Sequence, residues 1–167
     1  GRSLIKLNIG NPGAFGLRAP DHLQRAIADH IANTDPYTHQ QGLPEAREAI
    51  AAFHKARGAP NASPERVFVG NGVSELIDIS LRALLNPGEE VLLPSPDYPP
   101  RCAPTILYHV RQVYYQYDRD NGLLPDPKQI ESPLSPPTRL ILLNTPHNPT
   151  RLHHPRALAA RIPTLPH

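Results

Sequence analysis

Apolar positions in the first third of the chain follow the spacing of one short strand and two helices. Residues 4–9 alternate apolar with polar side chains like a strand and end at a turn cluster, Gly-Asn-Pro-Gly, at residues 10–13. Residues 20–32 carry apolar side chains three and four positions apart, which predicts a helix. A second helix is predicted from Pro44, because proline suits the first helical position, and it ends at Gly58.

The middle of the chain predicts a strand, a glycine turn and a helix in succession. Residues 67–69 are a short apolar run typical of a buried strand, and residues 70–72 form the turn. The helix over residues 74–85 is expected to bury five side chains: Leu76, Ile77, Leu81, Leu84 and Leu85. Further elements are predicted after it, namely strands at residues 90–93, 110–117 and 139–143 and a helical turn at 126–130. Strands that alternate with helices predict an α/β fold with a mostly parallel sheet.

Three loops follow predicted strands and are candidates for a ligand site. They cover residues 70–74, 94–99 and 144–150, and ligands of parallel sheets bind at the carboxyl ends of strands. In the first loop, glycine frees the backbone and a helix begins, so Gly72, Val73 and Ser74 could bind a phosphate. The alternative is a turn that uses glycine only for its conformation. Glu75 is expected to point away from a bound anion.

The second and third loops each hold one side chain suited to a planar ligand. Tyr98 lies in a frame of prolines, where its ring can stack on a ligand or simply cover the sheet edge. Asn148 follows a strand end and lies between two prolines. Its amide can donate to a phenolate-like oxygen, or it can be an ordinary turn asparagine.

Composition excludes several classes of function. The net charge is only +2, and the cationic residues are scattered, so nucleic-acid binding is not expected. One cysteine among 167 residues allows no internal disulfide and favours a cytoplasmic location. Apolar runs are far shorter than the roughly 20 residues that cross a bilayer, so no membrane span is expected. Nine histidines lack metal-ligand spacing, so we expect solvated surface histidines and no metal. The 22 prolines, concentrated at residues 87–104 and 125–149, predict turns there with little helix.

Taken together, these loops resemble those of the fold type I aminotransferases, which depend on pyridoxal 5′-phosphate (PLP). The most specific segment is Asn-Thr-Pro-His-Asn-Pro-Thr at residues 144–150. The resemblance covers residues 5–150 and is especially similar to the bacterial alanine (glutamate–pyruvate) aminotransferase branch. The motifs that carry this are Leu-Asn-Ile-Gly-Asn-Pro at residues 7–12, the segment from Tyr37 to Arg47, Gly-Asn-Gly-Val-Ser-Glu-Leu-Ile at 70–77 and Pro-Asp-Tyr-Pro at 96–99.

The resemblance implies part of a PLP-dependent transferase large domain, with α/β/α layers. Residues 1–36 would form an N-terminal arm and part of a small domain, and residues 37–150 the first part of the large domain. Where the family has glycine after Thr150, this sequence has Arg151, and no acidic residue or glycine follows. We therefore expect residues 151–167 to be a tail outside the family sequence, as a shifted reading frame would produce. The chain also starts without methionine, so the N-terminus is expected to be incomplete.

The resemblance also implies a role for each candidate residue. Gly10 would lie against the substrate carboxylate, and Tyr37 would reach the cofactor phosphate across the interface of a homodimer. Gly72, Val73 and Ser74 would cradle that phosphate. Tyr98 would stack on the pyridine ring, and Asn148 would bond its 3′ oxygen and contribute to the substrate site.

The implied reaction transfers an amino group from an amino acid such as alanine to a 2-oxo acid such as 2-oxoglutarate. The family uses a Schiff-base lysine as its catalytic residue, and Lys6, Lys55 and Lys128 all lie outside the three loops. No catalytic residue is therefore assigned, and the chain alone is expected to be inactive.

Three alternatives remain. Another PLP enzyme of this fold, such as a lyase or decarboxylase, would share the same cofactor contacts. A non-catalytic remnant would keep the α/β core. A nucleotide-binding domain could use residues 70–74, although their spacing matches neither a dinucleotide nor a P-loop fingerprint.

Overall fold

The computed structural model describes residues 10–98, 102–118, 120, 122–154 and 162. Contacts divide the chain into two compact units, Gly1–Val69 and Gly70–His167, which are described in turn. The strand expected at residues 4–9 lies outside the described residues.

The first unit is helical in its described part. Its α-helices are α1 (Asp21–His30) and α2 (Pro44–Lys55), and its short 3-10 turns are η1 (Pro12–Phe15), η2 (Ile31–Asn33) and η3 (Pro64–Arg66). Both predicted α-helices are present, and Pro44 is the first residue of α2 as expected. The Arg47 guanidinium donates to Gln41 Oε1 and to the Pro64 carbonyl, each at 3.2 Å. This side chain therefore ties α2 to the segments on either side of it.

The buried strand predicted at residues 67–69 is wrong. The segment pairs with no other strand among the described residues, and its side chains Phe68 and Val69 are 63% and 44% exposed. The Val67 N–H donates to the Pro64 carbonyl at 3.3 Å and the Val69 N–H to the Gln41 carbonyl at 2.9 Å, and neither acceptor belongs to a strand. An apolar run becomes a strand only when a neighbouring strand accepts its backbone hydrogen bonds, and sequence pattern does not show whether that neighbour is present.

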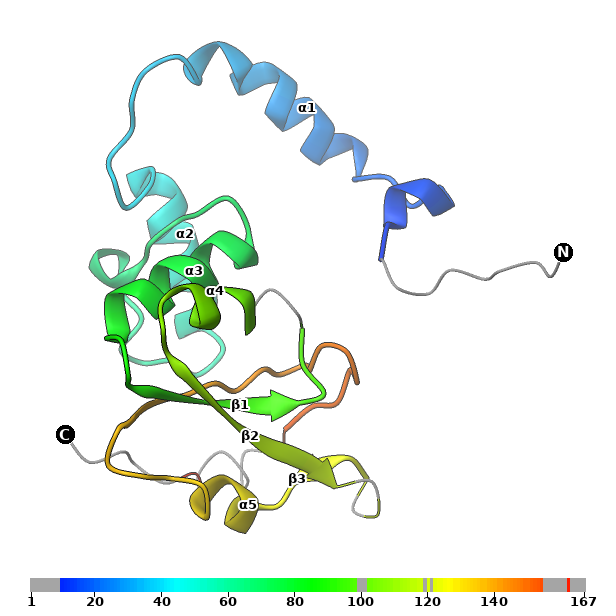
Figure 1. Ribbon diagram of the computed structural model, residues 1–167. Helices are drawn as coiled ribbons and strands as arrows, with labels where there is room; N and C mark the ends of the chain where they lie inside the picture. Colours follow the sequence, from blue (N-terminus) through cyan, green and yellow to red (C-terminus); the bar gives the residue numbers. More distant parts are fainter. Residues whose placement is uncertain (1–9, 99–101, 119, 121, 155–161, 163–167) are drawn as a thin grey trace, which may run out of the picture. The chain divides into compact units, whose positions relative to one another are not determined.

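The second unit is built on a four-stranded sheet of order β3-β2-β1-β4 (Figure 1). Its strands are β1 (Glu90–Ser95), β2 (Arg111–Asp118), β3 (Leu124–Pro125) and β4 (Thr138–Ile141). Strand β1 pairs in parallel with both β2 and β4, whereas the short β3 pairs antiparallel with β2. The expected α/β fold with a mostly parallel sheet is confirmed.

Helices cover both faces of this sheet. Figure 1 shows α3 (Val73–Leu84) and α4 (Cys102–Leu107) on one side and α5 (Pro127–Glu131) on the other. The side chains of β1 alternate accordingly, with Val91 and Leu93 packed in one core cluster and Leu92 in the other. Three layers, α/β/α, therefore enclose two cores.

Two local expectations for the helices of this unit are wrong. Leu84 is 59% exposed although its spacing predicted burial, since no described element packs over that position. Helix α4 forms within a proline-rich stretch where a loop was expected. Pro104 is the third residue of α4, and the first turn of a helix needs no N–H donor, so proline is tolerated there.

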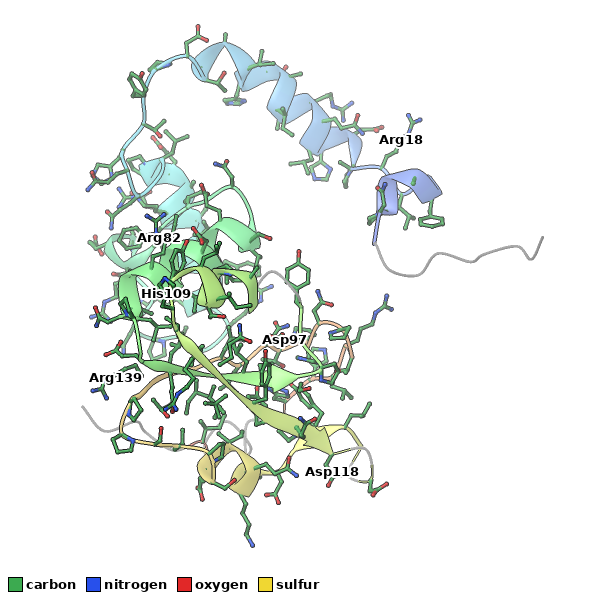
Figure 2. The ribbon with its side chains drawn as sticks, viewed as in Figure 1. Arg18, Arg82, Asp97, His109, Asp118 and Arg139 are labelled. Carbon is green, nitrogen blue, oxygen red and sulfur yellow. The ribbon has the colours of Figure 1, made fainter. Side chains whose placement is uncertain are left out.

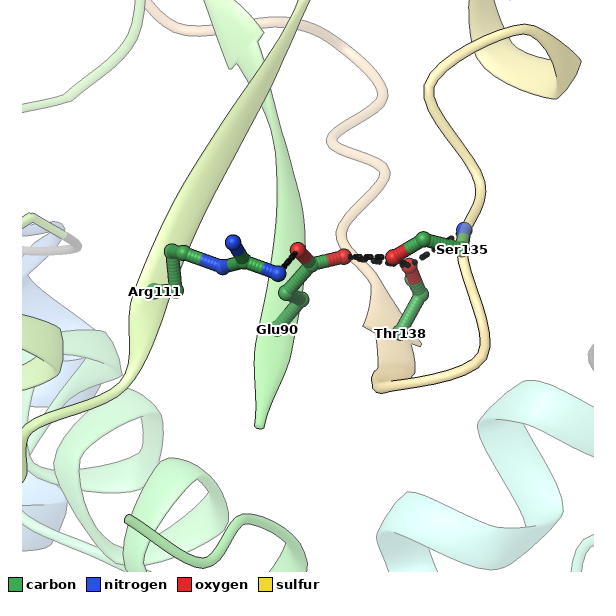
Figure 3. A network of polar contacts seen from close by, with 4 residues as sticks. All are labelled: Glu90, Arg111, Ser135 and Thr138. Carbon is green, nitrogen blue, oxygen red and sulfur yellow. Dashed lines mark hydrogen bonds and ion pairs between the residues drawn. The ribbon is translucent and has the colours of Figure 1, made fainter. Parts of the chain in front are cut away.

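A buried carboxylate joins the amino ends of three strands (Figure 3). Glu90 is only 3% exposed, and its Oε2 accepts from the Ser135 hydroxyl and from Thr138 Oγ1 at 2.9 Å, while Oε1 pairs with Arg111. The Ser135 hydroxyl is the main cause that lowers the pKa of Glu90, with Thr138 and Arg111 acting in the same direction against burial. The charge of Glu90 is thus satisfied within the fold.

Glu90→Gln is expected to lower the free energy of unfolding at pH 7 by about 2 kcal/mol, because charge-assisted hydrogen bonds are lost. A carboxyl whose pKa is lowered by folding stabilises the fold above its unfolded pKa of 4.5 and loses that contribution as the pH falls through the folded value. Urea unfolding of the wild type and of Glu90→Gln, at pH 7 and at pH 4, measures the difference in their free energies of unfolding at each pH. Glu131→Gln, at an exposed position of α5, is the control. Equal stability of the Glu90 and Glu131 variants would contradict this role.

Candidate functional site

The three predicted loops lie at one edge of the second unit. Because β1 and β4 are parallel neighbours, the loop after Ser95 and the loop after Ile141 leave the sheet at the same edge. Asp97 and Asp118 mark this edge in Figure 2, and Arg139 lies at the opposite end of the sheet. The start of α3 is here too, since Val73 and Leu143 line the same apolar groove of about 330 Å³.

The N-terminus of α3 is open to a ligand. Gly72 is its N-cap residue, with φ 90° and ψ 171°, and no side chain caps the helix end. Val73 and Ser74 are exposed, and their N–H groups have no hydrogen-bond acceptor in the described part of the chain. A Cβ added at Gly72 would meet no atom within 4 Å. Free amides and the positive end of a helix dipole favour an anion such as phosphate.

Glu75 was expected to point away from a bound anion, but its side chain lies beside this site. Its carboxylate turns back and accepts a hydrogen bond from the backbone N–H of Asn71, two residues before Val73. A glutamate at the third helical position commonly reaches back to the preceding turn and stabilises the positive helix end. An incoming anion would therefore meet one negative charge beside the amides of α3.

Tyr98 and Asn148 occupy the other two loops of this edge. Tyr98 is partly buried three residues after the end of β1, and Asn148 is exposed within a turn over residues 148–150. Their predicted contacts with a cofactor ring remain predictions. Gly10 and Tyr37 belong to the first unit, where Gly10 is exposed and Tyr37 is 106% exposed, and their roles also remain predictions.

The loop that carries Asn148 is closed on itself around a buried histidine. His147 is only 1% exposed, so the expectation of surface histidines is wrong at this position. Its Nδ1 lies 2.8 Å from Thr150 Oγ1, and its N–H donates to the Leu152 carbonyl at 2.8 Å. Its ring centroid lies 4.3 Å from that of Tyr117 on β2. Because most histidines in proteins are exposed, the sequence did not predict the burial of His147. The alternation of Tyr115 and Tyr117 in the sequence is nevertheless a signal for a shared aromatic face.

Arg151, where the resembling family has glycine, has a backbone conformation that favours glycine. Its φ is 62°, in the left-handed region that costs a side-chain-bearing residue about 1–2 kcal/mol. We expect Arg151→Gly to raise the free energy of unfolding by about 0.5–1 kcal/mol, because the greater freedom of glycine in the unfolded chain offsets part of the relief. Urea unfolding of the wild type and of Arg151→Gly measures this gain in the free energy of unfolding. Arg151→Ala removes the same side chain but keeps the strain, so an equal gain in both variants would contradict this explanation.

The described residues contain neither a membrane-spanning helix nor a cluster of metal ligands. Every helix there is too short or too polar to span a bilayer. The same part of the chain contains no group of three or more histidine, cysteine or acidic side chains placed to hold a metal ion.

Comparison with known proteins identifies the family. Residues 2–156 match the family model for aminotransferase class I and II. The chain is 38% identical to glutamate-pyruvate aminotransferase AlaA of Escherichia coli K12 over 162 residues, which are 97% of this chain and 40% of that protein. It is 40% identical to the alanine aminotransferase of Mycobacterium tuberculosis H37Rv over 151 residues, which are 90% of this chain and 35% of that protein.

Solved structures agree with this match. An aminotransferase from Escherichia coli superposes with a TM-score of 0.91 at 38% identity, over 97% of this chain and 40% of that chain. The alanine aminotransferase of Pyrococcus furiosus superposes with a TM-score of 0.89 at 31% identity, over 96% of this chain and 41% of that one. The chain thus spans about 40% of the length of such relatives. The sequence motifs, the fold and the family match agree, and the chain belongs to the class I and II aminotransferases.

Proposed function

We propose that this chain supplies the phosphate-binding part of a PLP-dependent aminotransferase that acts on alanine or glutamate and a 2-oxo acid. The single observation that carries the proposal is the open N-terminus of α3, which lies at the same sheet edge as the loops of Tyr98 and Asn148. The named relatives are glutamate-pyruvate and alanine aminotransferases, which favours this activity over a lyase or decarboxylase.

The residues at this edge suit PLP. Its phosphate would lie against the amides of Val73 and Ser74, where Gly72 leaves open space. Tyr98 would offer a ring to the pyridine ring, and the Asn148 amide would donate to the 3′ oxygen. When bound, PLP supplies the electron sink for the carbanion of the substrate.

The remaining contacts of the proposal concern the substrate and a second subunit. Gly10 would lie against the substrate carboxylate, and Tyr37 would reach the phosphate of a second subunit in a homodimer. The full exposure of Tyr37 in its own unit is compatible with such a contact.

We also propose a cytoplasmic enzyme with residues 1–36 as arm and small-domain part, residues 37–150 as large-domain part and residues 151–167 as a tail. Sequencing downstream of the coding region tests the tail, since the rest of the family sequence in another frame is the expected result and its absence would contradict a frameshift.

Asn148→Ala is expected to weaken PLP binding about tenfold or more, because a hydrogen bond to a charged oxygen contributes about 1.5–3 kcal/mol. Equilibrium dialysis of the 167-residue chain, followed by PLP absorbance, measures the dissociation constant. The control is Asn33→Ala, at an exposed position of η2 in the first unit.

Two outcomes would count against the proposal in different ways. Equal affinity in the wild type and the Asn148 variant would remove Asn148 from the site. PLP binding that inorganic phosphate fails to compete with, or no PLP binding by the wild type, would contradict the phosphate cradle at α3.

A further inference from the structure

Two tyrosines of β2 point to the face of the sheet that α5 covers. Tyr115 and Tyr117 are 1% and 6% exposed, and their ring centroids lie 5.9 Å apart. Both pack in one cluster with Leu92 of β1 and Ile130 of α5. The two tyrosine side chains therefore lie across the α5 face of β1 and reach toward β4, the strand that leads into the Asn148 loop.

These tyrosines contact that loop once and its two flanking segments once each. The Tyr115 hydroxyl donates to the Leu142 carbonyl at 3.0 Å, immediately after the end of β4. The Tyr117 ring packs against His147 at 4.3 Å between centroids. The Tyr117 hydroxyl shares a hydrogen bond of 3.1 Å with His154 Nε2, on the segment that returns past the loop.

Backbone contacts transmit the position of His147 to Asn148. The His147 N–H is held by the Leu152 carbonyl, and the His147 carbonyl accepts from the Arg151 N–H. The peptide that leads into Asn148 is therefore fixed by the contacts of His147. Thr145 Oγ1 accepts from the His154 N–H at 3.0 Å, which closes the loop further.

We propose that Tyr117 is a positioning residue for Asn148, acting through the His147 ring, and that Tyr115 fixes the entry of the same loop. This inference rests on the proposed function, in which Asn148 binds the cofactor ring. A side chain that is ordered before its ligand arrives loses less conformational freedom on binding, so the tyrosine contacts raise the affinity.

Hydrogen exchange on the full chain without cofactor tests the positioning directly. In Tyr117→Leu, the amides of His147 and Arg151 are expected to exchange about tenfold faster, because local opening of the loop becomes easier. A core amide of β1, such as that of Val91, should not change. The control is Tyr114→Leu, since Tyr114 lies on the same strand but is 42% exposed. Unchanged exchange in Tyr117→Leu would overturn the proposal.

Cofactor affinity gives a readout that a purely structural role would leave unchanged. Tyr117→Leu is expected to raise the dissociation constant for PLP about tenfold, the equivalent of one hydrogen bond lost from Asn148. Tyr117→Phe keeps the ring contact and should bind PLP nearly as the wild type does. A lower thermal midpoint with unchanged PLP affinity would overturn the positioning role.

A second variant covers the case in which Tyr117→Leu does not fold. His147→Leu removes the same contact from the loop side and leaves the strand intact, so it should show the same faster exchange at Arg151 and the same loss of affinity. Wild-type exchange and wild-type affinity in this variant would overturn the proposal. If the wild-type chain binds no PLP, the proposed function fails, whereas the exchange measurements still decide whether Tyr117 holds the loop.

Discussion

Gly72→Ala is expected to reduce binding of inorganic phosphate and of PLP about tenfold or more, and to lower the free energy of unfolding by about 1–3 kcal/mol. Gly72 has φ 90° and ψ 171°, a backbone conformation open almost only to glycine. An added Cβ meets no neighbour, so the cost is backbone strain and not a clash. Relief of that strain rotates the peptide that precedes Val73 and turns the first amides of α3 away from the anion. Isothermal titration with each ligand measures the affinity.

Gly88→Ala is a closely matched control for this variant. Gly88 has φ 87°, its added Cβ also meets nothing within 4 Å, and it lies in the turn between the end of α3 and β1. Both variants should lose similar stability, and only Gly72→Ala should lose affinity for phosphate. A similar loss of affinity in both would show that general destabilisation, and not the cradle, controls binding.

The second large effect concerns covalent attachment of the cofactor. Incubation of the 167-residue chain with PLP and reduction with borohydride should leave no stoichiometric pyridoxyl group on any single lysine, and the chain should not turn over alanine with 2-oxoglutarate. The family's chemistry requires a lysine amine at the reacting carbon of the cofactor. Lys55 ends α2 in the first unit, and Lys128 lies in α5, on the opposite face of the sheet from α3. Lys6 lies outside the described residues.

Peptide mass spectrometry locates any label. Low labelling spread over several lysines is the expected background, and Lys128→Arg should leave the labelling of the other lysines unchanged. A stoichiometric label at one lysine, together with turnover, would contradict the prediction and would assign that lysine to the site.

Local pattern was sufficient for most elements of the second unit. Helical spacing after the glycine turn predicted α3 within one residue at each end, and short apolar runs predicted β1, β2 and β4 to within a few residues. The alternation of these strands with helices predicted a mostly parallel sheet. That topology implied that loops after parallel strands share one edge, which holds for the loops after β1 and β4, whereas residues 70–74 follow no strand in the described part of the chain.

Long-range contacts set the features that local pattern missed. Residues 67–69 have the composition of a strand but lack a paired neighbour, since strand formation depends on hydrogen bonds from segments remote in sequence. His147 looked like a surface residue because its burial is created by Tyr117, thirty positions earlier in the chain, which only sheet formation brings beside it. Glu75 turned back toward Asn71 because the helix end attracts a carboxylate, which sequence spacing permits but does not require. Residue spacing along the chain determines periodic elements, whereas burial and side-chain direction depend on which distant segments pack together.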